Sequence, residues 1–348
     1  MISKFKAPLS AAIVLAVTLL AACSSAPPTI APPPPPPPAP AVVLGPKLIE
    51  QASAYRFYMD HVMAISPAFQ DADAVAKALQ VGAAYEPTQL LRGAIAYGAV
   101  AALQDPAFVA GVKTYSAHPE QRREVAYAIM RDPAYAVGLS GSASAAGLVV
   151  QALGGEGQKL YDAGKAVKQS AYDVQKQPWS KSDVPNRDLR LSQAKMLSAT
   201  PVVGDLTESA RLTRASTGAE PLAFAGASMA PPYSPVVIRS LAVAALAILG
   251  EAGDANIDTV MAVMAEPNVG FCMSLAKLNL YQCLAVSKPH YEDVFCLGQH
   301  AMMDTGRCMI KASGLPEPYE ARFVPVADDK HGYNAPKKAA KKVVKTKR

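Results

Sequence analysis

The sequence predicts an all-α protein, an Ala-rich multi-helix array or bundle with a disulfide-stapled helical hairpin near its C-terminus. Hydrophobic residues make up 51% of the 348 residues, and many of them are alanine, the strongest helix former. Only 7% of residues are aromatic, which favours close packing of helices through small side chains. Prolines that follow N-cap residues recur along the chain, and four late cysteines are spaced as rungs between two helices.

Residues 1–22 have the features of a secretory signal peptide. Lys4 and Lys6 form a basic segment, and an apolar stretch follows over residues 11–20. Small residues then precede a cysteine in Leu20-Ala21-Ala22-Cys23, and this tetrad resembles the lipobox of bacterial lipoproteins. The alternative is an ordinary secretory signal that happens to end near a cysteine.

The lipobox resemblance implies a lipid anchor on Cys23, such as palmitate, and therefore a membrane as the first partner of this chain. Ser24 and Ser25 follow the cysteine where an acidic residue would favour retention in the inner membrane. By the sorting rules of many lipoproteins, this implies an outer-membrane protein whose body faces the periplasm.

The lipid anchor and a proline-rich tether are expected over residues 23–46. Seven consecutive prolines, Pro32–Pro38, favour polyproline II and exclude packing into helix or sheet. At ~3.1 Å per residue the run gives a stiff spacer of roughly 20 Å. We interpret it as a stalk; the alternative is a binding site for a proline-recognising domain.

A helical body is expected over residues 47–178. Asp, Ser or a similar residue precedes each of several prolines, and such pairs are typical of helix starts. The predicted starts are Pro46, Pro67, Pro87, Pro106, Pro119 and Pro133. Three of them share a small-residue and aromatic pattern, which fits either a degenerate helical repeat or one helix opening used several times. A further amphipathic helix is predicted over Gln158–Lys176, preceded by a helix break at the glycine cluster 154–157.

An irregular connecting region is expected over residues 179–234, with one helix near Asp188–Leu197, because periodicity is lost and Pro, Ser and Thr increase. The disulfide-stapled helical region then covers residues 235–320. Its first segment, Pro235–Gly250, is apolar but short of the ~20 residues that span a bilayer, so it predicts a buried helix. No second membrane segment is evident from hydropathy.

The four cysteines after Cys23 predict two disulfides, because an even number in an exported chain is typical of disulfide bonding. Cys272 and Cys283 share one predicted helix and lie about 16 Å apart along it, too far for a bond. Nested pairs centred on the turn near Pro289 fit an antiparallel hairpin instead. The predicted pairs are therefore Cys283–Cys296 and Cys272–Cys308. Gly306 is expected to end the second helix, which places Cys308 just beyond it.

A zinc site is the alternative use of these residues. Cys296, His300 and Cys308, with His290, have spacing that zinc accepts, but no close Cys-x2-Cys pair is present. The sequence therefore predicts no metal and no cofactor. Motifs for nucleophilic, phosphate-binding and metallohydrolase sites are also missing, so no catalytic residue is assigned.

The C-terminal residues 321–348 predict a basic, disordered tail. Its cations are Lys337, Lys338, Lys341, Lys342, Lys345, Lys347 and Arg348. The chain carries a net charge of +6; removing two signal lysines and these seven cations leaves about −3 for the body. An acidic body argues against nucleic acid as a partner. The tail is expected either to remain solvated or to attract anionic envelope polymers, lipid phosphates or an acidic protein.

Together these observations predict a non-catalytic, lipid-anchored envelope protein, a scaffold or assembly factor that presents helical surfaces to partners. An envelope-directed hydrolase and a carrier of an apolar ligand are the alternatives. A deep cleft with converging His, Asp or Glu side chains would favour the hydrolase, a closed apolar cavity the carrier, and a broad exposed helical groove the scaffold.

Overall fold

Six of the described α-helices begin where an acceptor side chain caps the first turn, and in four of them the cap residue directly precedes a proline. Asp105 accepts from the backbone N–H of Phe108 at 2.7 Å, and Ser234 accepts from that of Val237 at 3.2 Å. The computed structural model describes residues 41, 42 and 44–319, and within them every named element is helical, which confirms the all-α class. The α-helices are α1 (Pro46–Met63), α2 (Ala72–Ala83), α3 (Pro87–Ala102), α4 (Pro106–Ser116), α5 (Pro119–Arg131), α6 (Ser142–Val174), α7 (Pro178–Lys181), α8 (Arg187–Ala199), α9 (Leu206–Ser216), α10 (Pro235–Ile248), α11 (Ile257–Val263), α12 (Pro267–Val286), α13 (His290–Cys296) and α14 (Thr305–Ser313). The shorter or wider helical turns are η1 (Pro133–Gly138), η2 (Asp254–Asn256) and η3 (Leu297–Asp304).

Two of the six predicted helix starts are wrong. The Ser66 hydroxyl accepts from the backbone N–H of Ala68 at 3.2 Å, which forms a local turn in place of a helix. The helix starts later, where Asp71 caps Ala74 at 2.8 Å. Pro133 opens the 3₁₀ helix η1 and not an α-helix. The helix α9 in the connecting region was not predicted, whereas α8 lies where a helix was expected.

The predicted helix break at residues 154–157 is also wrong, because α6 runs through this cluster without interruption from Ser142 to Val174. Its glycines allow close approach of the C-terminal helix. A Cβ on Gly157 would lie 2.8 Å from the backbone N of Ile310, and a Cβ on Gly306 would lie 2.9 Å from the carbonyl oxygen of Gly157. Gly164 and Gly298 meet in the same way. We call this contact the glycine seam.

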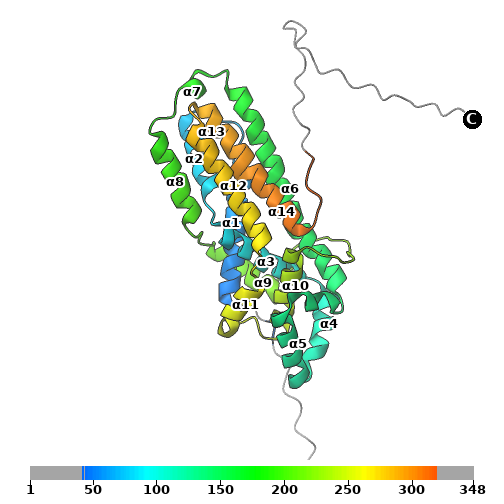
Figure 1. Cartoon of the computed structure of the whole chain (residues 1–348). Helices are drawn as coiled ribbons and strands as arrows, with labels where there is room; N and C mark the ends of the chain where they lie inside the picture. The colour runs from blue at the N-terminus through cyan, green and yellow to red at the C-terminus, as the bar shows by residue number, and fades with distance from the viewer. Residues whose placement is uncertain (1–40, 43, 320–348) are drawn as a thin grey trace, which may run out of the picture. The chain divides into compact units, whose positions relative to one another are not determined.

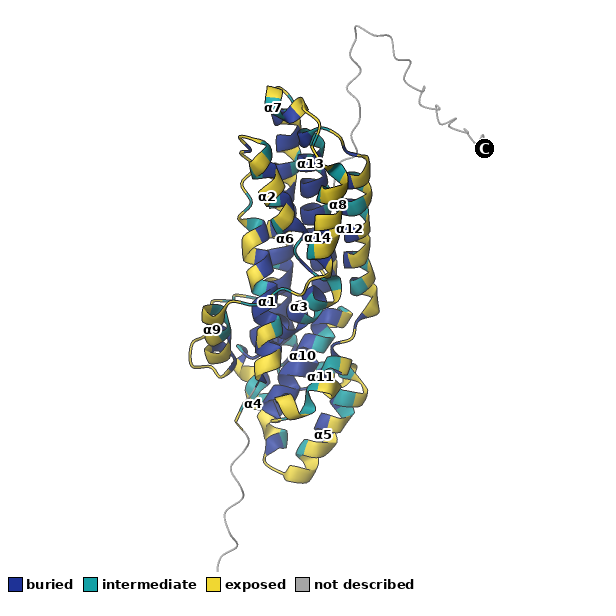
Figure 2. Cartoon of the chain, turned by 90° about the vertical axis from the view of Figure 1, so that its left-hand side faces the viewer, coloured by how far each residue is buried: buried dark blue, intermediate teal, exposed yellow. Residues whose placement is uncertain are grey.

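The core lies around α3 and α10, whose residues are mostly buried. The predicted buried helix at Pro235–Gly250 is thereby confirmed. Figure 1 shows α6, α12 and α14 packed together, with α2 and α8 on their flank and α4 and α5 at the other end of the helical body. Figure 2 shows that buried residues occupy the inward sides of these helices and exposed residues their outer sides.

The disulfide-stapled hairpin consists of α12 and a second helix formed by α13, η3 and α14 in succession. Cys272 bonds to Cys308 and Cys283 to Cys296, with Cα atoms 5.8 and 5.7 Å apart. The expected helix end at Gly306 is wrong: η3 is a π-helical segment that continues directly into α14. The outer disulfide therefore joins two helices, and both bonds are rungs of one hairpin.

Buried polar contacts tie the segment between α2 and α3 to this hairpin. Tyr85 Oη lies 2.8 Å from Thr305 Oγ1. Lys277 Nζ donates to the carbonyl oxygen of Ala83 at 2.6 Å and lies 3.4 Å from the centroid of the Tyr85 ring. Burial lowers the pKa of Lys277 well below its ordinary value. The N-terminal and C-terminal thirds of the body thus share one core.

The helix α12 is the one span among the described residues with the length and hydropathy to cross a membrane by itself; α3 and α4 would qualify only as a sharply bent pair. Core helices of soluble proteins pass the same test. Two disulfides and buried residues on its inner face, such as Met273 and Leu280, fix α12 in the body. The predicted lipid site Cys23 and the basic residues 337–348 lie outside the described residues.

Candidate functional site

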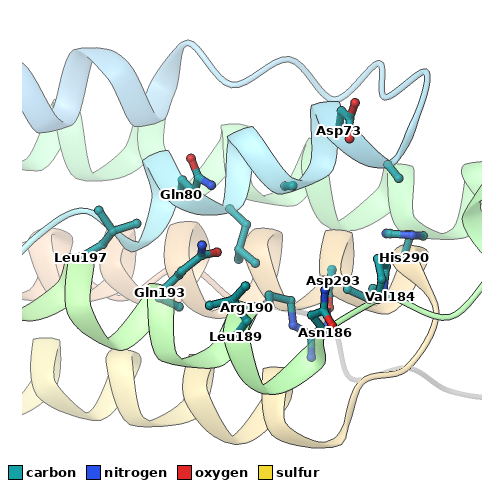
Figure 3. Close-up of a pocket in the computed structure, with 15 residues that line it drawn as sticks. Asp73, Gln80, Val184, Asn186, Leu189, Arg190, Gln193, Leu197, His290 and Asp293 are labelled. Atoms are coloured by element: carbon teal, nitrogen blue, oxygen red, sulfur yellow. Dashed lines mark hydrogen bonds and ion pairs between the residues drawn. The ribbon is translucent and has the colours of Figure 1, made fainter.

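A cleft between α2 and α8 is the first candidate site. It has a volume of about 280 Å³, close to the lower end of the ~300–1,000 Å³ of ordinary small-ligand sites. Figure 3 shows α2 and α8 running in the same direction, with Asp73 and Asn186 at one end and Gln80 and Leu197 at the other. The lining residues are Ala72, Asp73, Ala76, Leu79, Gln80, Val184, Pro185, Asn186, Leu189, Arg190, Gln193, Ala194, Leu197, His290 and Asp293. The cleft is therefore mainly apolar, with its charged groups gathered at one end.

A buried ion pair forms one wall of this cleft. Arg190 on α8 donates to Asp293 on α13 at 2.5 Å, and only 10% and 4% of these side chains are exposed. Ser287 donates a further hydrogen bond to the same carboxylate oxygen at 2.8 Å. Burial raises the pKa of Asp293, and the hydrogen bond and charge of Arg190 oppose that rise. The two charges neutralise each other, and Arg190 on α8 holds the carboxylate of Asp293 in place.

Arginines from α8 also bind the C-terminal carbonyl groups of α12. Arg187 Nε donates to Ser287 O at 2.8 Å, and Arg190 Nη2 donates to Leu284 O. These carbonyls lie at the negative end of α12, where cationic donors are most favourable. Two guanidinium groups thus fix α8 antiparallel to α12 and hold the cleft wall rigid.

His290 lies at the polar end of the cleft, at the first position of α13. It is only 8% exposed, and its ring makes no hydrogen bond to another residue that the structure describes. The backbone N–H of His290 donates to Ser182 O at 3.3 Å, which sets its position. In Figure 3 its ring lies at the same end as Asp73 and Asn186. At this end the cleft is lined by the buried imidazole of His290, which interacts electrostatically with Asp293.

An exposed apolar surface on α8 and α12 is the second candidate site. It consists of Leu189 and Met196 on α8 and Phe271, Leu275, Leu278 and Val286 on α12, and we call it the α8–α12 face. Phe271 and Val286 are 70% and 74% exposed. Figure 2 shows exposed residues along the outer sides of both helices. Several large apolar side chains exposed together on neighbouring helices are typical of an interaction surface.

A charged cluster joins α1, α6 and α9 on another part of the body. Arg56 pairs with Glu156 on α6, with Asp60 on α1 at 2.6 Å, and with Glu208 on α9 at 3.7 Å. Glu208 also binds Arg211 through two bonds of 2.7 Å. Each carboxylate faces a guanidinium, so this cluster connects helices, and Glu156 Oε2 is buried within it without a hydrogen-bond partner.

The residues of the alternative zinc site are used otherwise. Cys296 and Cys308 are in disulfides, and His300 Nδ1 lies 2.8 Å from Asp304 Oδ2 on the same helix. Among the described residues, the structure shows no group of three His, Cys, Asp or Glu side chains that could hold a metal ion.

Sequence reasoning missed both the cleft and the α8–α12 face. In the sequence, His290 is a candidate zinc ligand only, and Arg190 is one position within a predicted helix. The sequence contains one indication of the α8–α12 face, because Phe271, Leu275 and Leu278 are spaced to lie on one side of a helix. The same spacing is typical of core-facing positions, so it does not by itself predict an exposed surface. In comparisons with known proteins, no family model, no curated protein and no solved structure matches this chain.

Proposed function

We propose that this protein is a non-catalytic, lipid-anchored protein of the cell envelope, a scaffold or assembly factor that presents helical surfaces to partner proteins. The α8–α12 face is the observation that carries this proposal. An exposed apolar side chain loses the stabilisation of burial, about 1.5–3 kcal/mol for Leu, Val or Phe, and a partner that covers the face restores it. Six such residues on two adjacent helices give a partner an apolar core to bind.

The rigidity of this face supports the same function. Arg187 and Arg190 hold α8 to the end of α12, and two disulfides hold α12 to the second helix of the hairpin. A preformed surface loses little conformational entropy when it binds. A partner helix or sheet can therefore use the binding energy of the face without first ordering it.

The lipobox resemblance supports the location. Acylated Cys23 would anchor the mature chain, residues 24–46 would separate the body from the membrane, and Ser24 and Ser25 favour the outer membrane. The seven cations of residues 337–348 would add a separable attraction to anionic lipids or polymers, on the order of 1 kcal/mol each at most. Replacement of Cys23 by Ala should abolish lipid attachment, which intact-mass analysis and membrane fractionation detect.

The test of the scaffold function is site-specific photo-crosslinking in intact cells. A photoreactive phenylalanine analogue at Phe271 should give a discrete crosslinked product. The matched control is Tyr127 on α5, an aromatic residue that is also well exposed, at 62%, but is not part of the face. We expect little or no product from position 127.

Specificity is tested by placing charge on the face next to the crosslinker. Leu278→Glu should abolish the product from position 271 without unfolding the protein, since Leu278 is 48% exposed. Equal products from positions 271 and 127, or a product that persists in the Leu278→Glu variant, would contradict the proposed function.

A further inference from the structure

We propose that the cleft between α2 and α8 binds a small amphiphilic carboxylate, with its apolar chain between the two helices and its carboxylate against His290. This site shares Leu189 with the α8–α12 face, but it does not depend on the proposed scaffold function. Its two parts are an apolar channel and a polar end that matches an anion.

The apolar channel suits a short hydrocarbon chain. Leu79 on α2 and Leu189 and Leu197 on α8 supply large side chains around it. Small side chains, Ala72, Ala76 and Ala194, line the space between them and leave it unfilled. At about 280 Å³ the cleft accepts a small molecule and excludes a partner helix, whose diameter with side chains is about 10–12 Å.

The polar end suits an anion for two independent reasons. First, α2 and α8 are parallel with their N-terminal ends toward it; the first turn of α2 is capped by Asp71, so α8 provides the open positive end. Asn186, the N-cap residue of α8, makes no side-chain bond to the first turn of this helix, so those N–H groups are left without a side-chain cap. Second, the imidazole of His290 is nine-tenths buried, lines the cleft and makes no hydrogen bond to a described residue. A carboxylate would accept from both kinds of donor.

The charged side chains that line this end are one neutralised ion pair and one exposed carboxylate, so the attraction for an anion must come from the N-terminus of α8 and from His290. The carboxylate of Asp293 is already neutralised by Arg190, so it neither attracts a cation strongly nor repels an anion strongly. Asp73 is exposed at the mouth and is the one lining carboxylate without such a partner. The negative charge of Asp73 repels an anionic ligand, so a substitution that removes this charge tests whether the ligand is an anion.

The experiment compares three probes that share an eight-carbon chain: octanoate, octanol and octylamine. The full chain in lipid nanodiscs is titrated with each probe by calorimetry, and the histidine ring signals are followed by NMR. We expect octanoate to bind saturably and to shift the His290 ring signals, and the other two probes to bind at least about tenfold more weakly, a difference of ~1.4 kcal/mol.

Matched variants separate the cleft from non-specific uptake of the probe by lipid. Gln193 lines the cleft and Ser192, its neighbour on α8, does not, and both are exposed. Gln193→Phe should block octanoate binding, whereas Ser192→Phe should leave it unchanged. His290→Ala should weaken binding about tenfold, the loss expected for a hydrogen bond to a charged group, and His290→Gln should retain part of it because a donor remains. Asp73→Asn should strengthen it.

Three results would overturn the proposal. These are no saturable binding of octanoate to the folded wild-type chain, binding that survives both Gln193→Phe and His290→Ala, or tighter binding of octylamine than of octanoate. Ser192→Phe adds the same side chain as Gln193→Phe but outside the cleft, and His290→Gln keeps a hydrogen-bond donor. A variant that merely unfolds is recognised by its loss of helical circular dichroism.

Discussion

Two pairs of helices in this body pack in opposite ways. At the glycine seam, Gly157 of α6 and Gly306 of α14 face each other, and their backbones approach so closely that neither has room for a Cβ. Between α2 and α8, leucine, glutamine and alanine side chains line a cleft of about 280 Å³. The difference shows that side-chain size at facing positions decides whether a helix pair closes or leaves a site.

The largest effect on stability is expected from loss of the ion pair between Arg190 and Asp293, which forms one wall of the cleft. Arg190→Leu leaves Asp293 as a buried, unpaired carboxylate, so we expect a loss of about 3–5 kcal/mol in the free energy of unfolding. Arg190 lowers the pKa of Asp293, so its loss raises that pKa further above the unfolded value. The carboxyl becomes protonated and neutral as pH falls through this pKa, and the destabilisation should therefore shrink toward acidic pH.

Urea unfolding of this variant at neutral and mildly acidic pH measures both effects. Arg187→Leu is the control, because it removes bonds to carbonyl groups without leaving a buried charge. Asp293→Asn combined with Arg190→Leu should restore most of the stability. A cost for Arg190→Leu that is equal at both pH values would show that the buried charge of Asp293 is not its cause.

The second-largest effect on stability is expected from the two disulfides of the hairpin, whose helix α14 forms one side of the glycine seam. Replacing Cys272 and Cys308 by serine should cost about 4 kcal/mol, and replacing Cys283 and Cys296 about 3 kcal/mol, because the first bond closes the longer loop. The two sequence separations are 36 and 13 residues. Calorimetric melting of the two double variants measures the difference. The loop-entropy explanation is contradicted if the inner pair costs more than the outer pair.

The third effect tests the seam itself with two glycines of one helix. Gly157→Ala should destabilise the protein by about 1–3 kcal/mol, since its Cβ would lie 2.8 Å from the backbone N of Ile310. Gly155→Ala should stabilise it by about 0.5–1 kcal/mol, because alanine favours the helix and the nearest atom to its Cβ is 3.6 Å away. Thermal shifts of opposite sign are expected. Shifts of the same sign would mean that the seam does not need its glycines.

The smallest effect is expected on the α8–α12 face. Leu278→Ser should change the free energy of unfolding by less than about 0.5 kcal/mol, because the side chain is largely exposed. Leu280→Ala, two residues away and fully buried, should cost about 2–5 kcal/mol. Chemical denaturation of both variants makes the comparison. If Leu278→Ser were as costly as Leu280→Ala, the face would be part of the core and not a docking surface.

The sequence predicts helix starts, which depend on neighbouring residues. It does not predict the glycine seam or the cleft, which depend on contacts between residues far apart in the chain. Proline and its cap residue begin α3, α4 and α10 by local hydrogen bonds, so these starts could be read from the chain. The glycine cluster of α6 has the local appearance of a break, and only contact with α14 makes it a continuous helix. His290 and Arg190 meet at the cleft from separate helices, and no local pattern links them.

The bonds between the two ends of the body have a consequence for how the protein must be made. Tyr85 and Thr305 are separated by 220 residues, and Lys277 and Ala83 by 194. Contacts at such separations close large loops, which slows folding and makes it depend on the end of the chain. Until α14 has emerged, Gly157 on α6 and Cys272 on α12 lack the residues against which they pack or to which they bond, Gly306 and Cys308. A chain truncated before Thr305 should therefore be degraded or aggregate rather than form a smaller stable body.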